Sequence, residues 1–249
     1  MNTRSIAFAG FKALTLSVLA FSAQAASFTN NGGFEFNGGN GQVGSVTTLT
    51  GWTLPAPSDS YTFVFDMNAD TTGANGQYGG LSLWGPGNGS ANGLAVSPDG
   101  GYYVAMDSAF QNNGPLAQTI TGLTAGSTYT VGFYYAGAQQ KGEDGATTDY
   151  WKVGFGTQYQ NTDTLNIASL GFSGWNYASL AFVANASSEV LSFLAIGSGV
   201  HPFALLDGVT VNFTPTSTPT STPIPGAIFF VAPALAGVFG FSRRKQNKA

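Results

Sequence analysis

The chain has 249 residues, no cysteine and a net charge of −4. The lack of cysteine excludes a disulfide framework and any thiol-based zinc or redox chemistry. Between residues 27 and 213 only Lys141 and Lys152 are basic, whereas all twelve acidic residues lie there, which gives this part a charge of about −10. Because contact with a phosphate backbone needs a basic face, nucleic acid is not an expected partner.

Residues 1–25 contain the three parts of a secretory signal peptide. The basic residues Arg4 and Lys12 come first, an apolar run follows at 13–21, and Ala23-Gln24-Ala25 forms the cleavage site. This order predicts export and removal of residues 1–25 by signal peptidase. The alternative is an uncleaved anchor, but the apolar run is short for a membrane span.

Residues 27–213 predict one all-β domain. Apolar and polar residues alternate with a period of two in five runs, which indicates half-buried strands. The runs lie at residues 61–67, 129–135, 151–155, 190–196 and 209–213. In the fourth run, the residues taken to share one face are Val190, Ser192, Leu194 and Ile196. Clusters of Gly, Asn, Asp and Pro separate the runs, and no long amphipathic helix pattern occurs. We therefore expect a single antiparallel β-sandwich of jelly-roll type.

The chain ends in a spacer and a short hydrophobic segment. Residues 214–223 consist of Thr, Ser and Pro, a composition typical of a semi-rigid extended linker. Residues 224–249 hold an apolar run of 15 residues at 227–241, interrupted by Pro233, and then a basic cluster. A stable span needs roughly 20 apolar residues. The basic cluster favours a cytoplasmic C-terminus with the domain outside.

This tail resembles the C-terminal sorting signals of the PEP-CTERM class, especially the variant with a Val-Pro-Leu-Pro-Ala-type motif. The residues that carry the resemblance are Pro223, Pro225, Gly226, Arg243, Arg244 and Lys245. Ile224 and Gly226 depart from the usual motif. The resemblance implies processing by an exosortase in a Gram-negative bacterium that makes exopolysaccharide, with transient contact with the inner membrane. It implies a final place in the periplasm, at the cell surface or in the extracellular matrix. A retained membrane anchor is the alternative.

Catalysis is weakly indicated, and we expect no catalytic residue. The single histidine, His201, precedes a proline, and no Gly-x-Ser-x-Gly motif occurs. A glycosidase needs two carboxyl groups across a cleft, which sequence spacing does not identify. The carboxyl groups considered are Glu35, Glu143, Asp144, Asp149, Glu189 and Asp207. Glu143 and Asp144 are expected in an exposed hairpin loop.

Calcium binding is the chemistry that the sequence favours most. Calcium takes oxygen ligands from carboxylates and from carbonyls of Gly-rich loops. Glu35 near the start of the domain and Asp207 near its end lie in such surroundings. Asp207 shares parity with Val209, so it points towards the core unless Gly208 forms a bulge. The Asp-x-Asn-x-Asp spacing at residues 66–70 is a second candidate, for which we prefer a polar loop.

The ends of the domain also resemble galactose-binding-like jelly rolls, which include many carbohydrate-binding modules. The residues concerned lie at 31–35 (Asn-Gly-Gly-Phe-Glu), at 51–52 (Gly-Trp) and at 206–209 (Leu-Asp-Gly-Val). The resemblance implies that Glu35 and Asp207 bind a structural calcium ion.

Sugar binding needs exposed aromatic rings beside polar groups. Trp84 lies among small residues in a predicted loop, and Tyr134 and Tyr150 are expected to face outwards, so these three are the candidate ligand contacts. Trp52, Trp151 and Trp175 are expected in the core.

The preferred function is that of an exported, non-catalytic surface or matrix protein that contacts exopolysaccharide. The alternatives are a structural envelope or biofilm protein with no small ligand and, as the least favoured, an exported glycan hydrolase.

Overall fold

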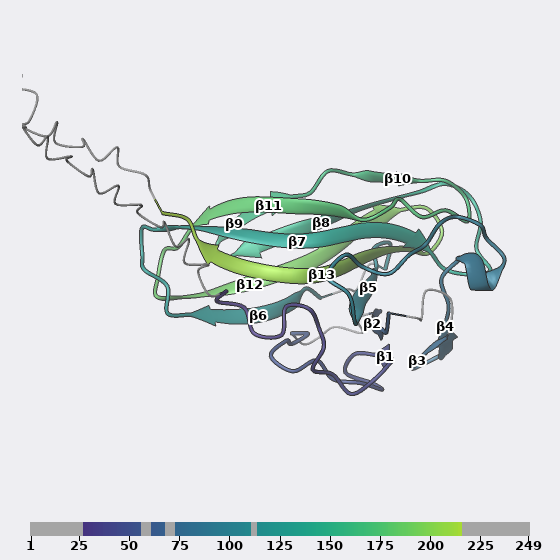
Figure 1. The fold of residues 1–249 in the computed structure, drawn as a ribbon, viewed down its shortest axis with the longest axis horizontal. Coiled ribbons are helices and arrows are strands. Elements are labelled where there is room, and N and C mark those ends of the chain that lie inside the picture. The colour runs from purple at the N-terminus through teal and green to yellow at the C-terminus, as the bar shows by residue number, and fades with distance from the viewer. Residues whose placement is uncertain (1–26, 56–60, 68–72, 111–113, 216–249) are drawn as a thin grey trace, which may run out of the picture. The chain divides into compact units, whose positions relative to one another are not determined.

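The computed structural model describes residues 27–55, 61–67, 73–110 and 114–215 (Figure 1). The predicted signal peptide, nearly all of the spacer and the sorting tail lie outside these residues, as do Asn68 and Asp70 of the second calcium candidate. The chain divides into two compact units after Thr214, and the first is described below. Within the described ranges, no helix is long and apolar enough to cross a membrane.

The described residues form an antiparallel β-sandwich, as predicted. One sheet has six strands in the order β1-β2-β5-β13-β7-β11, and the other has the path β10-β8-β12-β6 with β9 paired to β8 (Figure 1). A separate hairpin joins β3 to β4. The strands are β1 (Gly41–Gln42), β2 (Thr62–Phe65), β3 (Ala74–Gly76), β4 (Gly79–Leu81), β5 (Tyr103–Asp107), β6 (Leu116–Thr121), β7 (Thr128–Gln139), β8 (Thr147–Phe155), β9 (Gln158–Asn161), β10 (Leu165–Ile167), β11 (Asn176–Val183), β12 (Ser188–Ser198) and β13 (Pro202–Phe213). The one helical element described is the 3₁₀ turn η1 (Pro86–Asn88).

The main core lies between the two sheets. Alternate residues of β7 and β13 pack against alternate residues of β8 and β12, and the largest fully buried side chain is Trp151. Trp52 is also buried, as predicted, whereas Trp175 is only partly buried and packs against a second apolar cluster. The alternation in the sequence therefore identifies most inward-facing residues.

Strand β12 corrects one prediction. Its buried residues are Leu191, Phe193 and Ala195, whereas Val190, on the face expected to be apolar, is 49% exposed. Both faces of this strand carry apolar residues, so alternation alone does not identify the inner one. Pairing of Phe193 with Val153 of β8 places the Leu191 face in the core.

A second apolar cluster covers the outer face of the six-stranded sheet. Phe63, Phe65, Tyr103 and Phe203 contribute from β2, β5 and β13, and the segment from Ala74 to Leu94 lies over them. Strands β2 and β5 are consequently buried on both faces. Polar residues on the outer faces of these two strands are therefore covered by neighbouring loops.

Candidate functional site

The first candidate site surrounds Asp207, which is fully buried. The pairing of β13 with β7 shifts register between Asp207 and Thr210, and Gly208 has a φ of 60°. This is the β-bulge on which the predicted direction of Asp207 depended. Because of the bulge, Asp207 lies opposite Tyr134 on the outer side of the sheet, while Val209 returns to the main core.

The surroundings of the Asp207 carboxyl group do not compensate its charge. Burial raises its pKa to about 8, and the charges of Asp99 and Glu35 add to this effect. The Gly208 N–H donates to Oδ1 at 2.7 Å, and a hydrogen bond from Ser97 also opposes the shift. Among the described residues, Oδ2 has no hydrogen-bond partner. Such an oxygen indicates either a proton or a missing cation.

Glu35 and Asp99 are the acidic residues whose charges act on Asp207. Glu35 accepts a hydrogen bond from the Tyr102 N–H at 2.8 Å. A cavity of about 230 Å³, lined in part by Gly33 and Asp99, adjoins the bulge. No group of three or more His, Asp or Glu side chains in the described part of the chain has the arrangement of a metal site. Calcium binding at Glu35 and Asp207 therefore stays a prediction.

The second calcium candidate is described only in part. Asp66 accepts a hydrogen bond from the Asn40 side chain at 2.9 Å. Asn68 and Asp70 lie outside the described residues.

The three aromatic residues expected to contact a ligand are not brought together. Trp84 is half-buried, and its indole N–H donates to the Glu143 carbonyl at 2.7 Å in the exposed β7–β8 loop. Tyr134 packs edge-on against Tyr177, with ring centroids 5.1 Å apart. Tyr150 lies on β8 in the other sheet. These residues do not form one binding platform, so a ligand contact at any of them stays a prediction.

The sequence did not reveal a pocket beside the β3–β4 hairpin. It has a volume of about 280 Å³, and four Tyr and Phe rings contribute to its wall. The rings of Tyr61 and Tyr78 are stacked with centroids 6.0 Å apart, and that of Phe110 lies 4.6 Å from Tyr61. The other lining residues are Gln42, Phe63, Gly76, Gly79, Gly80, Leu81, Asp107, Gln140 and His201.

A tight turn positions the most exposed of these rings. Strands β3 and β4 are joined by Gln77 and Tyr78, between Gly76 and Gly79. Gly79 has a φ of 111°, a conformation that glycine adopts readily. Tyr78 at this turn is 75% exposed. The hairpin therefore exposes the Tyr78 ring to solvent. The glycines on either side of the turn leave the neighbouring backbone accessible.

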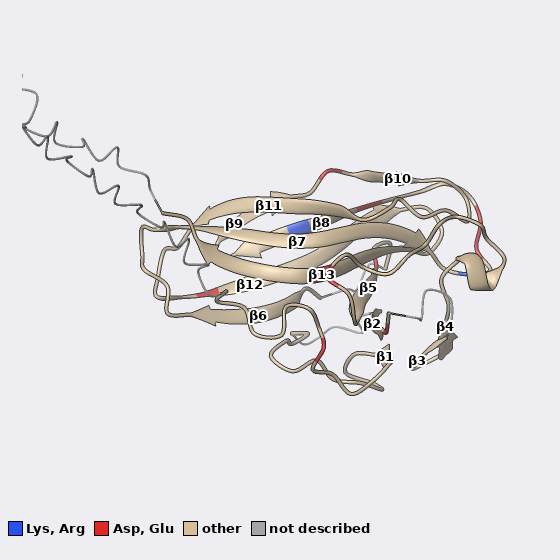
Figure 2. Ribbon diagram, viewed as in Figure 1, with Lys and Arg blue, Asp and Glu red and all other residues tan. Residues whose placement is uncertain are grey.

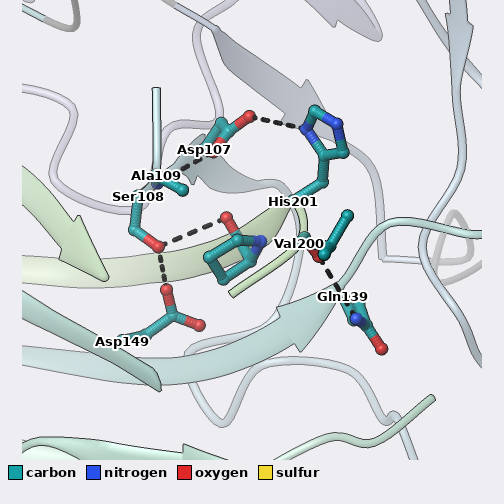
Figure 3. Close-up of polar contacts among 8 residues, drawn as sticks. Asp107, Ser108, Ala109, Gln139, Asp149, Val200 and His201 are labelled. Atoms are coloured by element: carbon teal, nitrogen blue, oxygen red, sulfur yellow. Dashed lines mark hydrogen bonds and ion pairs between the residues drawn. The ribbon is translucent and has the colours of Figure 1, made fainter. Parts of the chain in front are cut away.

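The polar side chains that line the pocket are Gln42, Asp107, Gln140 and His201. Figure 3 shows the contact between Asp107 and His201. Asp107 has the same parity on β5 as Tyr103 and therefore faces the outer side of the sheet. Its Oδ2 lies 3.4 Å from Nδ1 of His201, and its Oδ1 accepts from the Ala109 N–H at 2.9 Å. Burial raises the pKa of Asp107, while these hydrogen bonds and the charge of His201 oppose the shift. His201, expected as a loop residue without a role, thus contacts a buried carboxyl group.

A second buried carboxyl group lies behind this pair. Ser108 follows Asp107 and turns towards β8, where its hydroxyl contacts Oδ1 of Asp149 (Figure 3). The same hydroxyl donates to the Pro202 carbonyl at 3.3 Å. Burial raises the pKa of Asp149 to about 8, the Ser108 bond lowers it, and the charge of Asp107 raises it further. Ser108 is directed at Asp149 and His201 at Asp107, so the two do not form a nucleophile–base pair.

Comparisons with known proteins yield structural likeness alone. No family model matches the chain, and neither does any curated protein. The structure of TmCBM61 in complex with beta-1,4-galactotriose is 16% identical, with 76% of this chain and 100% of that chain covered and a TM-score of 0.43. A CBM4 structure is 19% identical, with 74% and 99% covered and a TM-score of 0.34. The CBM22-1 xylan-binding domain from Paenibacillus barcinonensis Xyn10C is 10% identical, with 77% and 93% covered and a TM-score of 0.35.

Proposed function

We propose that this domain is a non-catalytic carbohydrate-binding module that contacts a polysaccharide through the pocket beside the β3–β4 hairpin. The observation that carries the proposal is the combination of four Tyr and Phe rings with polar side chains in one cavity of about 280 Å³. Binding sites for small molecules typically combine an apolar wall with a few convergent polar groups. The C–H face of a sugar ring packs on the Tyr61 and Tyr78 rings, while Asp107 and Gln140 are within reach of its hydroxyl groups.

The test is binding of the domain to a panel of immobilised glycans, with Tyr78→Ala as the variant. Removing one stacking ring should weaken binding about fivefold, which corresponds to about 1 kcal/mol. Because Tyr78 is mostly exposed, the melting temperature of this variant should not change. Tyr159→Ala is the matched control, since Tyr159 is also an exposed tyrosine but lies on β9. Equal binding by all three proteins would contradict the site. Failure of the unaltered protein to bind any glycan would favour a purely structural role.

We also propose that the chain is exported and sorted. The support is the signal-peptide pattern of residues 1–25 and the tail that begins at Pro223 and ends beyond Lys245. Mass spectrometry of the protein from its native envelope should find an N-terminus at Ala26 and no residues from the basic cluster. An intact C-terminus in the membrane fraction would favour a retained anchor instead.

A structural calcium ion at Asp207 and Glu35 is a third proposal. It is supported by the partnerless Asp207 oxygen and by the nearby charges of Asp99 and Glu35, which an ion would neutralise. Ligands that bind only the folded state stabilise it. The melting temperature should therefore rise on adding millimolar calcium after EDTA treatment, and Asp207→Asn should abolish the rise. An unchanged melting temperature in the unaltered protein would contradict calcium binding.

A further inference from the structure

The charges around the pocket restrict the kind of sugar that can bind there. Asp107 is a lining residue, and neither lysine nor arginine occurs among the described residues that line the cavity. Both lysines of the described domain contact other groups. The Lys141 ammonium donates to the Asn88 side chain at 3.1 Å, and that of Lys152 lies 4.7 Å from the centre of the Tyr159 ring on the other sheet. Figure 2 shows more acidic positions (red) than basic ones (blue) along the ribbon.

The net charge of the whole domain also disfavours anionic ligands. Residues 27–213 contain twelve acidic residues and two basic ones. A negative surface slows the approach of anionic ligands and accelerates that of cationic ones. Polysaccharides that carry carboxylate or sulfate groups are therefore disfavoured by both the local and the overall charge.

Asp107 can take a stronger cationic partner than His201. Its distance of 3.4 Å from the His201 imidazole is long for a charge-assisted hydrogen bond, which is typically 2.7–2.9 Å. The imidazole is half exposed and carries a charge only when it is protonated. Burial raises the pKa of Asp107, and the hydrogen bonds from Ala109, His201 and Phe110 oppose the rise. A ligand cation placed in the pocket would add a further favourable interaction with this carboxylate.

We infer that the pocket selects a sugar with an unacetylated amino group, whose ammonium binds the Asp107 carboxylate while its ring packs on Tyr61 and Tyr78. This inference rests on the proposed function, because it assigns a ligand class to the same site. The aromatic wall adds to the preference, since a cation near the face of a tyrosine ring is attracted to it.

The experiment is calorimetric titration of the purified domain with four tetrasaccharides at about pH 6, where an amine is protonated. They are a glucosamine oligomer, its N-acetylated form, a glucose oligomer and a galacturonate oligomer. The glucosamine oligomer should bind at least about tenfold more tightly than the two neutral ones, as expected for a hydrogen bond to a charged group. The galacturonate oligomer should bind most weakly.

Two variants test whether the Asp107 carboxylate causes the preference for the amino sugar. Asp107→Asn keeps the shape of the side chain and should lower the affinity for the glucosamine oligomer to that for the neutral oligomers. Asp163→Asn makes the same change of net charge on the segment between β9 and β10, outside the pocket lining, and should leave the preference intact.

The outcomes separate the inference from the proposed function. Equal affinity for amino and neutral sugars, with binding still sensitive to Tyr78→Ala, would overturn the inference and leave the function standing. An equal loss of preference in both charge variants would show non-specific attraction and would overturn the inference as well. If no oligomer binds, the proposed function fails together with it.

Discussion

Asp149 offers the sharpest test of how burial controls charge in this domain. Its carboxyl group lies between the two sheets, and its Oδ2 has no partner among the described residues. A methyl group built on Gly137 would lie 2.9 Å from that oxygen, so the space on this side is filled. The Asp149→Asn variant keeps an oxygen that accepts from Ser108 and removes the ability to ionise.

The size of the effect follows from the pKa. The value rises from 3.8 in the unfolded chain to about 8 in the folded protein. Between these values the unfolded chain has lost its proton and the folded protein has kept it. Stability therefore falls as the pH rises from about 4 to about 8 and is constant above that range. At about 1.4 kcal/mol for each pH unit, Asp149 alone accounts for a loss of roughly 6 kcal/mol.

The free energies of unfolding of the Asp149→Asn variant and of the unaltered protein should cross as the pH rises. An amide nitrogen in place of Oδ2 has no acceptor beside Gly137, which costs about 1–3 kcal/mol at every pH. The variant should therefore be less stable at pH 4 and more stable at pH 8. Urea denaturation at several pH values, with EDTA present, measures both free energies of unfolding. Parallel curves would refute the reasoning, because they would mean that Asp149 does not keep its proton. Asp207 should leave a residual slope of the same sign, since its pKa is also raised to about 8.

Further predictions concern the core and the bulge. Phe193→Ala should destabilise the domain by about 3–5 kcal/mol, because the ring is fully buried beside Trp52, Phe133 and Trp151. Val190→Ala on the other face of β12 should change stability by less than about 0.5 kcal/mol, and similar losses for the two would contradict the observed face. Gly208→Ala should cost about 1–2 kcal/mol, since its φ is 60° and the added methyl would lie 3.0 Å from Asp99 and Tyr134. Gly126→Ala, where φ is 80° and the methyl meets nothing within 4 Å, should cost less, so an equal cost would argue against crowding at the bulge.

The fold is largely predictable because one physical signal dominates it. In β8 and in the first part of β7 a single face is mainly apolar, and alternation by itself places Phe133 and Trp151 in the core, where they lie. The signal fails in β12, where both faces are apolar. It also gives no indication that β2 and β5 are buried on both sides, because the covering segment from Ala74 to Leu94 is rich in glycine and has little periodicity.

The pocket is not predictable, because its residues meet only in the folded chain. Asp107 and His201 are separated by 94 positions, and Tyr61 and Tyr78 come from elements on either side of a loop. The Gly-Gln-Tyr-Gly-Gly sequence at 76–80 is the one local signal, since a tyrosine between glycines favours an exposed hairpin turn. Glu35 and Asp207 are identifiable only because a family resemblance joins the two ends of the domain.

Two neighbouring carboxyl groups in this domain should have opposite protonation states because their surroundings differ. Asp107 accepts a hydrogen bond from the Ala109 N–H, contacts His201 and lines the pocket. It therefore carries the negative charge that a cationic ligand would contact. Burial and the negative charge of Asp107 raise the pKa of Asp149 to about 8 against the hydrogen bond from Ser108, so Asp149 carries a proton at neutral pH. The consequence is a separation of effects between two conservative variants. Asp107→Asn should abolish the preference for amino sugars. Asp149→Asn should flatten that pH dependence and leave sugar affinity within about twofold. If Asp149→Asn reduced affinity as strongly as Asp107→Asn, the two groups would act as one unit, and the assignment of charge to one and proton to the other would be wrong.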